Sequence, residues 1–250
     1  MLIHGAAMEV VSGLRPAFEG LARPREVIAK WGVQPTGGAD RSAVRDVSLP
    51  QGRFFLKVYA YSGLWRLRTI CIPARAGREF RNLERMARLG FRVPEPVAWG
   101  QERTLGWLSV SFVMTRAVEQ AVDLRSMIDR PGAFPQPTPA ERRDLVGEFA
   151  RTLRRAHDGR FFIHTLRAKN LLLARENTRW ALYVLDVPFA GIGRYRIFPE
   201  WGRVRDLAVL MKWARVLVPR TDRMRFARQY GASRELLRKA QAYQERHYSG

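Results

Sequence analysis

Apolar and polar residues alternate along much of the first half of the chain, with the period of β-strands. Two such runs, Ser42–Leu49 and Arg53–Tyr61, are separated by the turn residues Pro50-Gln51-Gly52 and predict a hairpin. Two further strand-like runs follow, Pro96–Gly100 and Trp107–Thr115. The first half is therefore expected to be rich in β-structure.

One segment of the first half has helical periodicity instead. Between about Arg75 and Leu89, the apolar residues Phe80, Leu83 and Ala87 recur at spacings of three and four, and Gly90 follows. This pattern predicts a single helix between the hairpin and the later strands.

The second half is expected to be mostly helical. Thr138 and Glu141 form a capping-box pattern with Pro139 at the first helical position, and they predict a helix that runs to about His157. Two short strands and two further helices follow: Asn170–Ala174, Ala181–Asp186, about Arg203–Leu217 and Ser233–Tyr248. A β-rich half followed by a helical half predicts an α+β fold with two lobes, residues 1–116 and 117–250.

The charge of the chain is strongly positive. It has 44 basic and 23 acidic residues, a net charge of +21. Such a field favours a polyanionic partner, namely nucleic acid, an anionic membrane surface or a phosphorylated glycolipid; the alternative is an arginine-rich surface that is only solvated. The sequence has no helix-turn-helix signature, zinc-ligand spacing or RNP motif, so we expect no specific nucleic-acid partner.

Three features of the sequence bear on the cellular location. The single cysteine, Cys71, excludes an internal disulfide and fits a reducing compartment. No apolar run approaches the roughly 20 residues that span a bilayer, and the N-terminal residues lack the apolar stretch of a secretory signal. We therefore expect a cytoplasmic protein.

Lys57 and Glu79 are the first candidates for chemistry. Lys57 lies in the middle of an apolar strand, on the same face as Phe55 and Tyr59, where an ammonium is rare unless it meets a fixed anion. The alternative is an edge-strand lysine that extends to solvent. Glu79 lies near the start of the following helix and could reach Lys57, or it could simply complement the helix dipole.

A second group of candidates lies between residues 161 and 186. His164, Lys169 and Asn170 lead into an apolar strand, and the next strand ends at Asp186. An asparagine and an aspartate at adjacent strand ends are suited to Mg²⁺, which takes oxygen ligands and shares them with substrate phosphates.

The order of these residues resembles the protein-kinase-like fold. The match is closest to the lipopolysaccharide kinase (Kdo/WaaP, InaA-like) family, over roughly residues 37–230. It rests on five segments: LKVY, AGREFRNLERMARLGFRVPEPVAWG, LRRAHDGRFFIHTLRAKNLLL, YVLDVPFAG and RVRDLAVLMKWARVL. The resemblance implies a small β-rich N-lobe, a reduced helical C-lobe, and a kinase that uses ATP and Mg²⁺.

The resemblance also implies residue roles. Lys57 would hold the nucleotide phosphates and Glu79 would orient it, while Asn170 and Asp186 would bind Mg²⁺. The stretch Ser42–Val47 would cover the phosphates, although its only glycines are Gly37 and Gly38 just before it. The stretch Phe112–Ala117, which includes Met114 and Arg116, would be the adenine-binding hinge. Asp206 would brace the catalytic loop.

The catalytic loop departs from the family pattern because its aspartate is missing. Counting from Asn170 places Thr165 at the position of the base, and counting from His164 places Leu166 there. His164 could act as a substitute base or be structural, and Lys169 could neutralise the transferred phosphoryl or be a solvated turn residue.

Two functions remain open from the sequence. The first is a kinase for a heptose or Kdo hydroxyl of the lipopolysaccharide core, an anionic glycolipid, acting at the cytoplasmic face of the inner membrane. The second is a pseudokinase that binds nucleotide or glycolipid without turnover.

Overall fold

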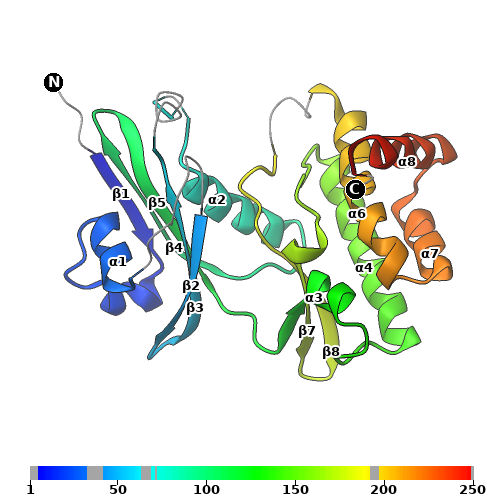
Figure 1. Cartoon of the computed structure of the whole chain (residues 1–250), viewed down its shortest axis with the longest axis horizontal. Helices are drawn as coiled ribbons and strands as arrows, with labels where there is room; N and C mark the ends of the chain where they lie inside the picture. Colours follow the sequence, from blue (N-terminus) through cyan, green and yellow to red (C-terminus); the bar gives the residue numbers. More distant parts are fainter. Residues whose placement is uncertain (1–4, 33–41, 63–68, 71, 192–196, 249–250) are drawn as a thin grey trace. The chain divides into compact units, whose positions relative to one another are not determined.

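The computed structural model describes residues 5–32, 42–62, 69–70, 72–191 and 197–248. They form two compact units (Figure 1). The first unit comprises the described residues of Met1–Glu84 and Pro94–Ala117, and the second comprises Arg85–Val93 and the described residues of Val118–Gly250. Gly37, Gly38 and Cys71 lie outside the described residues.

A five-stranded antiparallel sheet is the frame of the first unit, with the strand order β1-β4-β5-β3-β2. Its strands are β1 (Gly5–Val10), β2 (Ser42–Leu49), β3 (Gly52–Ala60), β4 (Pro96–Thr104) and β5 (Trp107–Arg116). The predicted hairpin is confirmed, because Leu49 pairs with Gly52 across a two-residue turn. Gly52 has a φ of 130°, which favours glycine at this position.

The two faces of this sheet are covered by different helices, and Figure 1 shows α1 and α2 on opposite sides of it. One face is buried against the 3-10 helix η1 (Ser12–Phe18) and α1 (Pro24–Lys30). The β3 side chains buried there are Phe54, Leu56 and Val58. On the other face, Tyr59 packs with residues of α2 (Arg75–Arg88). Because side chains alternate along a strand, Lys57 shares the face that α2 covers.

The first 32 residues contain more structure than the sequence pattern indicated. Only one helix was expected in the first half, yet β1, η1 and α1 precede the hairpin. Helix α1 has only seven residues, fewer than two full turns, so its apolar periodicity is too short to recognise. Its burial against the sheet supplies the stability that its length does not.

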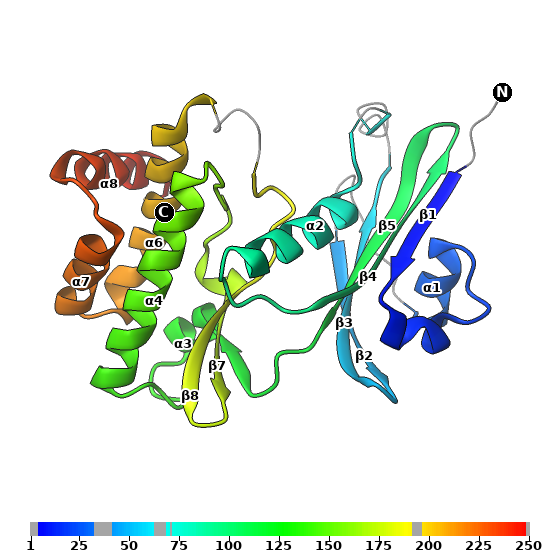
Figure 2. The same ribbon diagram turned by 180° about the vertical axis from the view of Figure 1, so that it is seen from behind.

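The second unit contains a three-stranded sheet and most of the helices. The strands are β6 (Ala121–Asp123), β7 (Leu171–Glu176) and β8 (Arg179–Val184). The helices are α3 (Leu124–Asp129), α4 (Pro139–Asp158), the 3-10 turn η3 (Ala168–Asn170), α6 (Pro199–Leu217), α7 (Arg220–Tyr230) and α8 (Arg234–Tyr248). Helix α7 packs on α4, as Figure 2 shows, and α8 packs on α6.

Helix boundaries in this unit agree with the prediction in part. The capping box at Thr138 is present, and α4 ends one residue beyond His157. Helix α6 begins at Pro199, four residues before the expected Arg203. Helix α7 was not predicted, because arginines interrupt its apolar periodicity.

The two units together confirm the α+β fold class. The first is built on a sheet and the second mainly on helices. Within the described residues, no helix is both long enough and apolar enough to cross a bilayer.

Candidate active site

Lys57 and Glu79 form an ion pair in the first unit. Lys57 Nζ lies 3.3 Å from Glu79 Oε1 and 3.2 Å from Oε2. The two side chains are 16% and 5% exposed, so the pair is mostly shielded from water. This contact confirms that the helix carboxylate reaches the strand lysine, as the sequence suggested.

Tyr59 fixes the carboxylate of this pair. Its hydroxyl donates a hydrogen bond to Glu79 Oε2, and its ring lies 5.1 Å from Lys57 Nζ. A buried carboxylate needs such partners, because an unpaired buried charge is costly. Glu79 and Tyr59 thus hold Lys57 in one place, and a small part of its side chain remains exposed.

Met114 and Arg116 lie at the end of β5. Strand β5 continues to Arg116, so the backbone of both residues lies in the ladders between β4 and β3. The Met114 side chain is fully buried, and Arg116 Nε donates to Glu95 Oε2 at 2.6 Å. Residues 112–116 thus lie at the end of the strand, directly before the boundary between the two units at Ala117, and their assignment to an adenine-binding hinge stays a prediction.

The segment predicted to be the catalytic loop belongs to the second unit, and Asp206 of α6 organises it. The carboxylate of Asp206 accepts hydrogen bonds from the backbone N–H groups of Ile163 and His164, both at 2.7 Å. His164 has a φ of 65°, which is unfavourable for a residue with a side chain. The expectation that Asp206 braces this loop is confirmed, and its two acceptor oxygens offset the backbone strain.

His157 is a second support, which the sequence reasoning missed. It is fully buried at the end of α4, with Nε2 3.0 Å from Asp206 Oδ2 and Nδ1 2.7 Å from Tyr230 Oη. The sequence did indicate that His157 is buried, because it continues the spacing of four from Phe149 and Leu153 on the apolar face of α4. Its partner Tyr230 could not be found, because α7 itself was not predicted.

The pKa of Asp206 reflects these partners. Burial raises the pKa of this carboxyl, but the hydrogen bond from His157, the charges of His157 and His164, and the N–H of Ile163 outweigh burial. The pKa of Asp206 therefore lies below its ordinary value. The site therefore favours the ionised carboxylate of Asp206, which is the form that accepts the two hydrogen bonds from the loop.

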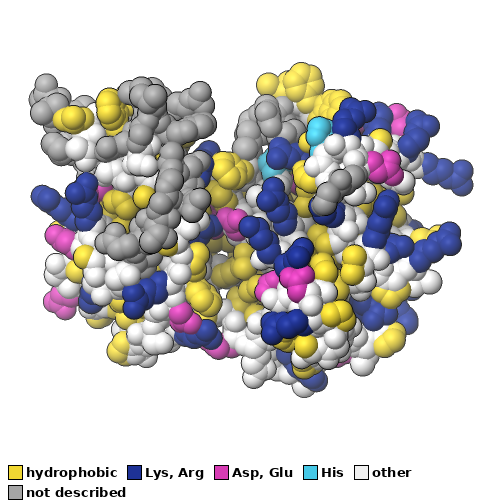
Figure 3. All heavy atoms as spheres, viewed as in Figure 1, with side chains coloured by type: hydrophobic (Ala, Val, Ile, Leu, Met, Phe, Trp, Pro, Cys, Tyr) yellow, Lys and Arg dark blue, Asp and Glu magenta, His cyan; other side chains and the backbone are white. Residues whose placement is uncertain are grey.

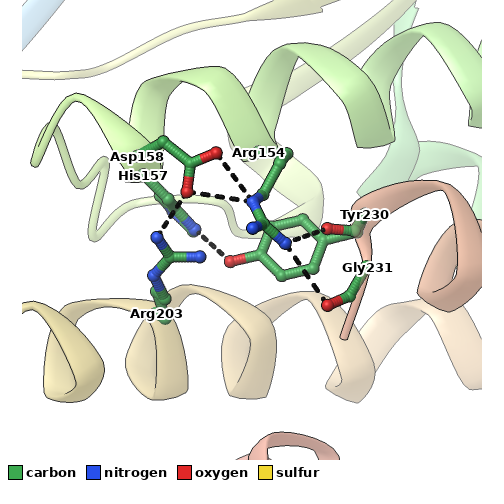
Figure 4. Close-up of polar contacts among 6 residues, drawn as sticks. All are labelled: Arg154, His157, Asp158, Arg203, Tyr230 and Gly231. Carbon is green, nitrogen blue, oxygen red and sulfur yellow. Dashed lines mark hydrogen bonds and ion pairs between the residues drawn. The ribbon is translucent and has the colours of Figure 1, made fainter. Parts of the chain in front are cut away.

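Figure 4 shows a layer of ion pairs next to His157. Asp158 accepts hydrogen bonds from Arg154 Nε at 2.7 Å and from Arg203 Nη2 at 2.6 Å. Arg154 also donates to the carbonyl oxygens of Tyr230 and Gly231, at 2.9 and 3.3 Å. One guanidinium thus joins the end of α4 to the end of α7.

His164 lies beside Asp206 and is buried, with its side chain 2% exposed and its Nδ1 3.8 Å from Asp206 Oδ1. A base must reach the hydroxyl that it deprotonates. Because its ring is buried against Asp206, a structural role for His164 is favoured over a role as the base.

Asn170 distinguishes the two alignments of the missing aspartate. Its Nδ2 donates to the backbone oxygen of Thr165 at 2.9 Å, whereas Leu166 is fully buried in the core. Thr165 is half-buried and adjoins the asparagine. The geometry therefore favours Thr165 for the position of the base, and it carries no carboxylate.

Asn170 and Asp186 are close in the fold. The N–H of Leu185 donates to the Asn170 carbonyl at 2.8 Å, which places the next residue, Asp186, beside Asn170. Because Asn170 Nδ2 is used by Thr165, its Oδ1 is the atom left for a cation. Among the described residues, no group of three or more His, Cys, Asp or Glu side chains could hold a metal. One amide and one carboxylate fit Mg²⁺ that takes further ligands from phosphates and water.

Comparison with known proteins identifies the family. The family model described as lipopolysaccharide kinase (Kdo/WaaP) matches residues 64–230. The chain belongs to this family. No curated protein matches it.

The chain shares its fold with a solved structure of WaaP, a name that also appears in the family description. A structure of WaaP in complex with acyl carrier protein matches with a TM-score of 0.67 and 21% identity, over 96% of this chain and 97% of that chain. The Mycobacterium tuberculosis PknI kinase domain matches with a TM-score of 0.45 and 16% identity, over 86% and 98% of the two chains. The likeness to WaaP establishes that this lipopolysaccharide kinase family member has the kinase-like fold predicted from its sequence.

Proposed function

We propose that the chain is an ATP- and Mg²⁺-dependent kinase that phosphorylates a heptose or Kdo hydroxyl of the lipopolysaccharide core. Membership of the kinase family supports phosphate transfer. The observation that carries the nucleotide assignment is the Lys57–Glu79 pair, in which a mostly buried carboxylate holds an ammonium in a fixed place.

Each residue of the candidate site has a role in this proposal. Lys57 binds nucleotide phosphates, and Glu79 with Tyr59 holds it. Asn170 and Asp186 bind Mg²⁺, which neutralises phosphate charge when it is present. Lys169 is exposed in the turn before Asn170 and stabilises charge on the transferred phosphoryl group.

Turnover does not require a carboxylate at Thr165. Phosphoryl transfer goes through a loose transition state in which positioning and charge stabilisation dominate. A general base contributes typically ~10²–10⁴-fold. His164 acts as a positioning residue in this proposal, because its ring is buried against Asp206. The chain is then a slow kinase rather than an inert one.

The test combines nucleotide binding with phosphate transfer to core oligosaccharide. Mg·ATP at 100 times its dissociation constant should stabilise the wild type by about 2.7 kcal/mol. Lys57→Met should weaken this stabilisation, and Asp186→Ala should abolish transfer. Matched controls are Lys30→Met and Asp144→Ala, which change exposed residues of the same types.

Two results would reject parts of this assignment. Indifference of both activities to Lys57→Met and Asp186→Ala would exclude the nucleotide site. Nucleotide binding without transfer, with oligosaccharide supplied, would instead identify a pseudokinase.

A second proposal concerns a protein partner. The solved WaaP structure contains acyl carrier protein. In this chain, the observation that favours such a partner is a cavity of about 470 Å³ in the second unit. Its lining is mainly apolar and includes Leu145, Leu210, Met211 and Phe226, with the exposed Arg215 and Arg220 among its polar members. Pockets of this size and character bury small apolar ligands.

We therefore propose that an acyl chain on acyl carrier protein occupies this cavity. Acylated carrier protein should bind the chain, and carrier protein without an acyl group should bind at least about tenfold more weakly, because each buried CH₂ contributes ~0.8 kcal/mol. Ala214→Phe, which fills the cavity, should remove that difference. Equal binding of both carrier forms would exclude the proposal.

A further inference from the structure

Three large apolar side chains are exposed at the start of α6. Ile197 and Phe198 directly precede the helix, and Trp201 lies in its first turn. Their exposed fractions are 72%, 61% and 60%. Figure 3 shows hydrophobic side chains gathered on the surface at this end of α6. These three residues are called the apolar patch below.

The patch lies on a part of α6 that is fixed in position. Gly202 lies so close to the ring of Phe162 that a Cβ atom there would be 2.5 Å from it. Val204 and Asp206 are also buried, so the inward side of the helix start is fully packed. The patch is therefore the outward side of an ordered element, and contiguous exposed apolar residues of this kind mark interaction sites.

The surroundings of the patch are basic. The one acidic residue in the run 197–201, Glu200, forms an ion pair with Lys239 of α8. Helix α8 carries four exposed basic residues and two exposed acidic ones, namely Arg234, Arg238, Lys239 and Arg246 against Glu235 and Glu245. On the face of the second unit seen in Figure 3, dark blue side chains outnumber magenta ones. A partner of the patch therefore meets more positive than negative charge around its apolar contact.

We propose that the apolar patch inserts into the headgroup region of an anionic phospholipid bilayer. Tryptophan and phenylalanine are favoured at this interface, and each nearby arginine or lysine adds attraction to anionic lipids. The chain-wide net charge of +21 complements such a surface. The inference rests on the proposed function in one respect, because it supplies the contact by which the kinase reaches a membrane-bound acceptor.

Vesicle binding tests the proposal. The full chain should sediment with phosphatidylcholine vesicles that contain phosphatidylglycerol, and much less with phosphatidylcholine alone. The triple variant Ile197→Ser, Phe198→Ser, Trp201→Ser should bind the anionic vesicles at least roughly tenfold more weakly, because it loses its inserted apolar surface. Brominated lipid should quench the fluorescence of the wild type more than that of Trp201→Ser.

The matched control is Val216→Ser. Val216 is 67% exposed on the same helix, and its substitution should leave vesicle binding unchanged. The triple variant should also keep wild-type stabilisation by Mg·ATP and wild-type transfer to delipidated core oligosaccharide. These two readouts separate loss of membrane contact from loss of folding.

Two outcomes would overturn the inference. One is equal vesicle binding by the triple variant and the wild type. The other is a wild-type dimer in light scattering that the triple variant cannot form, which would make the patch an interface between two copies. Failure of the proposed kinase function is distinguishable, because it would abolish phosphate transfer while patch-dependent vesicle binding remained.

Discussion

His157 Nε2 lies 3.0 Å from Asp206 Oδ2, and both side chains are fully inaccessible to solvent. The carboxylate accepts this contact in addition to two backbone N–H groups of the catalytic loop. A buried carboxylate with three hydrogen-bond donors is a stable anchor, but each donor depends on the others remaining in place.

The first prediction concerns Asp206 itself. Asp206→Ala should lower the free energy of unfolding by about 3–5 kcal/mol, because it leaves His157 and two loop N–H groups buried without their acceptor. Urea denaturation measures the change. Asp144→Ala, at an exposed aspartate, should stay within about 0.5 kcal/mol of the wild type. An equally small effect at Asp206 would contradict its role as the anchor.

The second prediction concerns Tyr230 at high pH. Burial raises the pKa of Tyr230 to about 12, against 10.0 in an unfolded chain. The protonated tyrosine therefore contributes stability that is fully present below pH 10 and is lost as pH rises towards 12. The loss amounts to about 2–3 kcal/mol, and chemical denaturation at a series of pH values should reveal it.

Tyr230→Phe is the control for this titration. The variant should be about 1–3 kcal/mol less stable at neutral pH, because His157 Nδ1 loses its hydroxyl partner. It should also lack the Tyr230 share of the alkaline decline. Tyr183, whose pKa burial also raises to about 12, remains in the variant and should still titrate. An unchanged alkaline profile would show that Tyr230 does not carry the effect.

The third prediction concerns the orientation of Lys57. Glu79→Gln keeps the shape of the side chain but removes the charge that holds the ammonium. We expect kcat/KM for ATP to fall on the order of 10²-fold, the effect of displacing a positioned catalytic group. Glu84→Gln on the same helix should leave kinetics unchanged. Equal kinetics for both variants would mean that the buried pair is only structural.

The fourth prediction is a gain of function in the catalytic loop. Thr165→Asp places a carboxylate beside Asn170 and should raise phosphate transfer by up to ~10²-fold, the lower range for a general base. Thr165→Asn is the matched control without a carboxylate, and it should show no increase. Leu166→Asp should instead destabilise the fold, because Leu166 is fully buried. A rate increase with Leu166→Asp alone would reverse the alignment.

The spacing of apolar residues along the chain predicted the features of the fold that depend on neighbouring residues. Strand alternation placed Lys57 on one face, and the helix that follows placed Glu79 within reach of it. Strand β5 was predicted to end at Thr115 and ends one residue later, at Arg116, which pairs with β3 and donates from its backbone N–H to the Glu95 carbonyl oxygen at 2.8 Å. Strand ends fixed by distant partners leave no local signal.

The candidate site shows the same division. Asp206 was recognised from its place in a motif, but the contact of His157 with Tyr230 joins residues 73 positions apart. Tyr230 lies in α7, where arginines interrupt the apolar periodicity that would have predicted the helix. The choice between Thr165 and Leu166 likewise required the hydrogen bond from Asn170, since counting along the loop gave both answers.

Tyr230 occupies the last turn of α7, at the periphery of the helical unit, yet its hydroxyl reaches the imidazole that contacts the loop anchor. Local opening of α7 would therefore admit water to His157 and loosen the backbone around residues 163 and 164. Amide hydrogen exchange in that loop should consequently follow the exchange of α7 rather than that of the neighbouring strands. The order of the loop at residues 163 and 164 therefore depends on α7, through His157 and Asp206.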